Sequence, residues 1–176
     1  MPLLLLLPPG ELLLLSSAVV LHEAGHLFAF AVLGEPTPAL SAVAAGLTLR
    51  ARRPLSYGRE AVVCLAGPLA NLLLSLPLLL CPGIGAAGKL TGAVHLLTAA
   101  ANLLPLRASD GGRAVRALLS SVLPLGAVEA IAGALALTTV AVILLFSLFL
   151  LHSAGGGGGL ILLVGLLSRA TAERGC

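Results

Sequence analysis

The stretch Leu21-His22-Glu23-Ala24-Gly25-His26 has the pattern H-E-x-x-H and lies inside an apolar segment that runs from about residue 12 to residue 33. On a helix, His22 and His26 are four residues apart, so both side chains lie on one face and can bind one zinc ion. Glu23 follows the first histidine, where its carboxylate can act as a general base toward water at the metal. Because ionisable side chains are costly in hydrocarbon, this cluster predicts a functional site.

The composition indicates a membrane protein. Of the 176 residues, 59% are hydrophobic and only 10% are charged, whereas a soluble domain carries about 25% charge. We therefore expect an all-α membrane protein that forms one transmembrane domain over residues 1–176. The net charge of +3 is small and aromatic residues are few, so nucleic-acid binding is not expected.

Apolar segments predict a polytopic helical bundle of five transmembrane segments, although the last is short for a full crossing of a bilayer core of about 30 Å. Between the third and fourth segments, residues 113–123 predict a helix at the membrane interface. After the first segment, residues 46–50 alternate in polarity, which is typical of a short strand, although a loop is equally compatible. The five predicted spans are residues 12–33, 60–80, 90–106, 125–151 and 154–167.

The basic residues predict the orientation of these spans, because lysine and arginine gather in cytoplasmic loops. With five crossings, nine of the ten basic residues lie on one side, and only Lys89 lies on the other. This predicts a multi-pass protein of the cell membrane with an external N-terminus. It also places the two histidines and Asp110 at similar depth, so the site would open toward the cytoplasm.

A catalytic zinc ion usually takes three protein ligands and keeps one position for water. Asp110 has the depth of the histidine pair and carries a carboxylate that would be costly unpaired. His95 lies about two turns before Asn102 and is expected to be a polar packing residue. His152 lies at the opposite depth and is expected at the interface. We therefore favour Asp110 as the third ligand.

Three motifs, in order and in separate spans, carry a resemblance to a known family. They are His22-Glu23-Ala24-Gly25-His26, Gly67-Pro68-x-x-Asn71, and Asn102-x-x-Pro105 followed by Asp110-Gly111. Together they resemble the signatures of the site-2 protease family of intramembrane zinc metalloproteases. The resemblance covers a three-helix core at residues 11–116, and residues 117–168 would add further helices.

The resemblance implies a role for each matching residue. His22, His26 and Asp110 would ligate one zinc ion, and Glu23 would take a proton from the attacking water and pass it to the leaving amine. Asn71 and Asn102 would bind the substrate backbone or its oxyanion, because amide donors stabilise such charge well in a low-dielectric site. For each asparagine, a hydrogen bond between helices is the structural alternative.

The resemblance also implies the partners. The chain has no room for an inserted PDZ or an appended CBS domain, so it is similar to the minimal bacterial members that process sporulation sigma factors. The substrate would be a membrane-embedded or membrane-associated protein, and a regulatory membrane partner would govern access. Residues 46–50 would offer a strand edge to an extended substrate.

Two other functions compete with a zinc endopeptidase. A zinc transporter would explain the histidines and Asp110, but it needs neither Glu23 nor the two asparagines. A catalytically inactive protease-like binding protein is disfavoured because every expected catalytic residue is present. Replacement of Glu23 by glutamine separates these functions, since only the protease requires its carboxylate.

Overall fold

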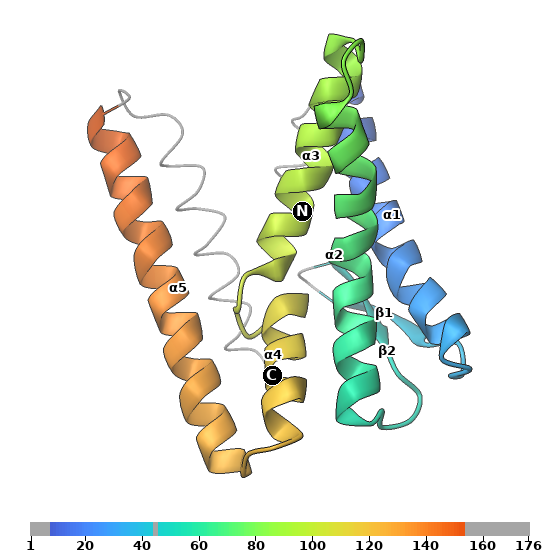
Figure 1. Cartoon of the computed structure of the whole chain (residues 1–176), viewed down its shortest axis with the longest axis vertical. Coiled ribbons are helices and arrows are strands. Elements are labelled where there is room, and N and C mark those ends of the chain that lie inside the picture. Colours follow the sequence, from blue (N-terminus) through green and yellow to red (C-terminus); the bar gives the residue numbers. More distant parts are fainter. Residues whose placement is uncertain (1–7, 44–45, 154–176) are drawn as a thin grey trace.

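The computed structural model describes residues 8–43 and 46–153. Within them the chain forms five helices and one β-hairpin (Figure 1). The helices lie close to the predicted segments, so the all-α membrane architecture is confirmed. They are α1 (Pro9–Val32), α2 (Tyr57–Leu80), α3 (Ala86–Leu103), α4 (Asp110–Ser120) and α5 (Leu125–Ser153).

The hairpin follows α1 and consists of β1 (Ala39–Val43) and β2 (Gly46–Arg50), which pair antiparallel with Ala39 opposite Arg50. β2 coincides with the strand expected at residues 46–50. β1 was not predicted, because four of its five residues are apolar and the sequence lacks a clear alternation of polarity.

Within residues 8–43 and 46–153, three helices are long and apolar enough to cross a membrane: α1, α2 and α5. The expected third span, α3, has 18 residues and includes Lys89, His95 and Asn102, which lower its hydropathy. It also ends at Leu103 rather than at residue 106. The predicted fifth span, residues 154–167, lies outside the described residues. The five-crossing count and the orientation therefore stay predictions.

α2 is the central helix and packs against α1, α3 and α4 (Figure 1). Its contact with α1 is close because both helices present small residues there. A Cβ atom on Gly25 would lie 2.6 Å from the Ala66 carbonyl oxygen and 2.9 Å from the Ala70 Cβ. Small residues on α2, Ala66, Gly67 and Ala70, therefore let α1 approach closely.

The turn between α3 and α4 positions Asp110. Leu104, which precedes Pro105, has an extended conformation with ψ 138°, because proline disfavours a helical residue before it. Ser109 then caps α4: its Oγ accepts a hydrogen bond from Gly112 N at 3.2 Å and donates to a carbonyl of the turn, Leu106 O, at 2.9 Å. α4 consequently begins at Asp110, three residues before the expected interfacial helix.

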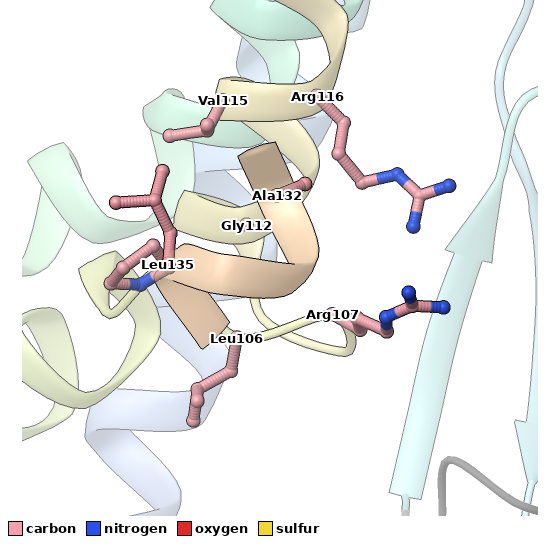
Figure 2. Close-up of a pocket in the computed structure, with 8 residues that line it drawn as sticks. Leu106, Arg107, Gly112, Val115, Arg116, Ala132 and Leu135 are labelled. Atoms are coloured by element: carbon pink, nitrogen blue, oxygen red, sulfur yellow. The ribbon is translucent and has the colours of Figure 1, made fainter. Parts of the chain in front are cut away.

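The last described helix, α5, packs mainly against α4 and stands apart from α1 and α2 in Figure 1. Glu129 of α5 forms ion pairs with Arg116 of α4 and with Arg107, whose Nη2 lies 3.6 Å from Glu129 Oε2. Figure 2 shows both arginines among the residues that line a pocket between α4 and α5. None of the six predicted site residues lines this pocket.

Candidate active site

The structure brings His22, His26 and Asp110 together in one group, with one ligand atom from each. His22 Nε2 lies 2.8 Å from Asp110 Oδ2 and 3.1 Å from His26 Nε2. His26 Nε2 lies 3.3 Å from the same carboxylate oxygen. Both histidines are buried, and only 13% of the Asp110 side chain is exposed. The site is thus built by the buried face of α1 and the first residue of α4.

The backbone of α2 orients one of the two imidazoles. His26 Nδ1 donates a hydrogen bond to the Val63 carbonyl oxygen at 2.7 Å, so the neutral ring keeps its lone pair on Nε2, which faces the group. Such a second hydrogen bond is usual for a histidine that ligates a metal. His22 Nδ1 is also buried, but it has no partner within the described chain.

Asp110 occupies the N-terminus of α4, where the helix dipole favours a negative charge. Burial alone would raise the pKa of its carboxyl group, but the contacts with His22 and His26 outweigh burial and lower the pKa below its ordinary value. Asp110 is therefore ionised at neutral pH. Its second oxygen, Oδ1, lies 4.0 Å from Arg113 Nη1.

The donor set fits a zinc ion. In a tetrahedral site with metal–ligand bonds of about 2.0–2.1 Å, the ligand atoms lie about 3.3 Å from one another. The three separations here, 2.8 to 3.3 Å, are close to that value. Two nitrogens and a carboxylate oxygen this near repel one another unless a proton or a cation lies among them. Three ligands also leave a position for water, as a catalytic zinc site requires.

Glu23 is half-buried and lies beside the group rather than in it. It directly follows His22 and is an i, i+3 neighbour of His26 on α1. Within the described residues no hydrogen bond or ion pair involves its side chain. The role of Glu23 as general base therefore stays a prediction.

Among the described residues, the two predicted substrate-binding asparagines make no hydrogen bond to the metal-ligand group. Asn71 is fully buried on α2, and its Oδ1 lies 2.9 Å from His95 Nδ1. Asn102 is half-buried and donates from Nδ2 to Thr98 O, a carbonyl of its own helix, at 3.0 Å. Their roles toward a substrate therefore stay predictions.

The other two histidines lie outside the metal-ligand group. His95 is buried on α3 as a polar packing residue, and His152 is exposed in the last turn of α5. Neither joins His22, His26 and Asp110. The preference for Asp110 over His95 as the third member therefore agrees with the geometry.

Gly67 lies directly against the two histidines. A Cβ atom at this position would be 2.5 Å from His26 Nε2 and 2.9 Å from His22 Nε2. Contacts this short force a shift of the imidazoles or of α2. The glycine of the second motif thus leaves room for the ligand atoms, in addition to allowing the two helices to approach.

Replacement of Gly67 by alanine is expected to displace both imidazoles, lower zinc affinity at least about tenfold and lower stability by about 1–3 kcal/mol through overpacking. Zinc titration and thermal unfolding of the purified protein in detergent would measure both effects. Gly58→Ala on the same helix is the matched control, because a Cβ atom at Gly58 has nothing within 4 Å. Equal zinc affinity in the two variants would contradict the contact between Gly67 and the histidines.

Three contributions to the site were missed by sequence reasoning. The Ser109 cap could have been found, since serine before a helix is a strong N-cap signal. The contact of Gly67 with the imidazoles and the Val63 carbonyl that orients His26 leave no such signal. A backbone carbonyl is present at every residue, so only the packing of the helices selects one.

The fold and the site together define a helical membrane protein with a buried His-His-Asp group. No protein-family model matches the chain, and no curated protein matches it. Among solved structures, it is similar to the site-2 protease from Methanocaldococcus jannaschii, with a TM-score of 0.64 and 24% sequence identity. The match covers 94% of this chain and 76% of that protein. The chain therefore has the fold of that protease, while the sporulation-type subgroup stays a prediction.

Proposed function

We propose that this protein is a zinc-dependent intramembrane endopeptidase that hydrolyses a peptide bond of a membrane-embedded or membrane-associated protein. The observation that carries the proposal is the convergence of His22 Nε2, His26 Nε2 and Asp110 Oδ2 within 3.3 Å of one another. The fold shared with a site-2 protease supports it. A carboxylate such as Glu23 next to a metal ligand is needed for hydrolysis, whereas a site that only binds metal does not need it.

Each residue then has a definite task. A zinc ion held by His22, His26 and Asp110 would supply the Lewis acidity that activates water and polarises a peptide carbonyl. Glu23 accepts the proton of the attacking water and donates it to the leaving amine, as a general base and then a general acid. Val63 and Ser109 hold His26 and Asp110 in place.

The surroundings of the site favour a substrate within or beside the membrane. The group is formed by α1, which is long and apolar enough to span a bilayer, and its two histidines are buried. We infer that the protein crosses the cell membrane several times with the site toward the cytoplasm, as the arginine distribution favours. The edge of the β-hairpin offers pairing for an extended substrate segment.

Removal of the metal tests the proposal. We expect treatment with a zinc chelator to lower cleavage at least about 100-fold, because the metal supplies several kcal/mol of transition-state stabilisation. Added zinc should restore cleavage. The measurement uses the purified protein in liposomes with a panel of labelled single-span peptides, and metal analysis determines the zinc content in parallel.

The outcomes separate the competing functions. Chelator-sensitive cleavage supports the protease. A protein that binds one zinc ion and moves zinc across the liposome membrane, but cuts no peptide of the panel, would overturn the proposal in favour of a transporter. Cleavage that is unaffected by complete zinc removal would exclude zinc from the reaction.

A further inference from the structure

A second polar cluster, buried at His95 and Asn71 and exposed at Ser17, links the three helices α1, α2 and α3. At its centre is His95 of α3, which is 1% exposed. Its Nδ1 lies 2.9 Å from Asn71 Oδ1 on α2, and its Nε2 lies 3.4 Å from Ser17 Oγ on α1. Ser17 also donates to the Leu14 carbonyl oxygen at 2.7 Å. The shorter and better buried contact of His95 is therefore the one with Asn71.

The amide nitrogen of Asn71 is left without a partner. Asn71 is 0% exposed, and its Nδ2 makes no hydrogen bond within the described residues. An unsatisfied buried donor costs about 1–3 kcal/mol, so this nitrogen calls for an acceptor from outside the described chain, such as a bound ligand or water. Here the available donor suits the carbonyl oxygen of a peptide.

Asn71 lies on the side of α2 that faces the metal-ligand group. It is four residues after Gly67, so the two positions lie on the same side of the helix, about 6 Å apart along its axis. Gly67 itself lies against His22 Nε2 and His26 Nε2. Asn71, whose Nδ2 has no partner, therefore lies about one helical turn from the position on α2 that contacts the ligand atoms.

We propose that His95 is a positioning residue that directs the Asn71 amide nitrogen toward a substrate peptide carbonyl. This inference rests on the proposed endopeptidase function. His95 Nδ1–H donates to Asn71 Oδ1, which fixes the carboxamide with its oxygen toward α3 and its nitrogen free. The two ends of a carboxamide are nearly equal in size, so without this bond the group can turn over and present its oxygen instead.

Three variants of His95 test the geometry. In His95→Asn the amide nitrogen can take the place of Nδ1, whereas in His95→Gln it falls near the place of Nε2. His95→Leu removes both ring nitrogens, and with them the donor to Asn71. We expect His95→Leu and His95→Gln to lower kcat about 10- to 100-fold, with KM and zinc content nearly unchanged. His95→Asn should recover most of the rate.

A double-mutant cycle tests whether His95 acts through Asn71. Asn71→Leu is expected to lower kcat about 100- to 1,000-fold, the usual effect of losing an oxyanion donor. Adding His95→Leu to Asn71→Leu should cause no further loss, because a positioning residue has no effect once its target is gone. Independent, multiplicative losses would overturn the inference. So would equal rates in His95→Asn and His95→Gln.

The control variant is Thr91→Val on the same helix, since Thr91 is part-exposed and bonds only the Ala87 carbonyl of α3. It should leave kcat unchanged. If the wild-type protein shows no cleavage that depends on Glu23, the proposed function fails and this inference fails with it. If the wild type cleaves but the cycle is multiplicative, the inference alone fails. The pair His95→Asn and His95→Gln decides the question even if His95→Leu does not fold.

Discussion

Replacement of Glu23 by glutamine is expected to lower peptide cleavage about 100- to 10,000-fold while the protein keeps one zinc ion per chain. The change removes the group that takes the proton from water and preserves the size of the side chain. Zinc is retained because Glu23 lies beside the His22–His26–Asp110 group and contributes no atom to it. Rates from single-span peptides in liposomes and metal analysis of the same preparation measure both quantities.

Glu11→Gln is the matched control for this experiment. Glu11 is an exposed carboxylate in the first turn of the same helix, about three turns before Glu23, so its loss should leave cleavage unchanged. A Glu23→Gln protein that cleaves within about tenfold of the wild-type rate would exclude Glu23 as the general base. A variant that loses zinc together with activity would show that Glu23 supports the metal rather than the proton transfer.

Replacement of Asp110 by asparagine is expected to weaken zinc binding at least about 100-fold, and cleavage should disappear with the metal. Loss of a neighbour of a metal ligand already costs about 10- to 100-fold in affinity, and here one of three ligands is changed. The neutral asparagine amide is a weaker ligand than a carboxylate. The replacement also removes the negative charge that offsets the positive charge of the metal. Zinc titration against a competing chelator would give the change in affinity.

Glu129→Gln provides a carboxylate control for Asp110→Asn. Glu129 pairs with Arg107 and Arg116 between α4 and α5, outside the metal-ligand group, so zinc affinity should not change. Wild-type zinc affinity in Asp110→Asn would remove Asp110 from the ligand set. Because a zinc transporter would also lose binding with Asp110, this experiment does not separate hydrolysis from transport, whereas the Glu23 experiment does.

The helices follow closely from the sequence, and the reason is local. Long apolar runs bounded by proline and glycine predicted α1, α2 and α5 to within about three residues at each end. This works because a segment buried in lipid must satisfy its own backbone hydrogen bonds, as a continuous helix does. β2 was predicted for a similar reason, since alternation of polarity is a local pattern. α3 was placed less well, because Pro105 ended the helix earlier than its apolar run suggested.

The site was predictable in its residues but not in its geometry. His22 and His26 are four residues apart, so helical periodicity alone predicts that their side chains lie together on one face. Asp110 could be inferred from its predicted depth and from the third motif, but only the turn held by Ser109 brings it to 2.8 Å from His22. The predicted binding of substrate by the two asparagines stays a prediction, and the sequence did not show that Asn71 hydrogen-bonds to His95 and Asn102 to its own helix.

The sequence by itself therefore determined that this is a helical membrane protein, which helix carries the histidine pair, and which side chains are candidates for the site. These properties depend on composition and on short-range periodicity. Only the tertiary structure decided which partners meet: the Val63 carbonyl with His26, Gly67 with both imidazoles, and His95 with Asn71. Such contacts depend on how closely the helices approach and how they are rotated, and no residue pattern within a single helix specifies either.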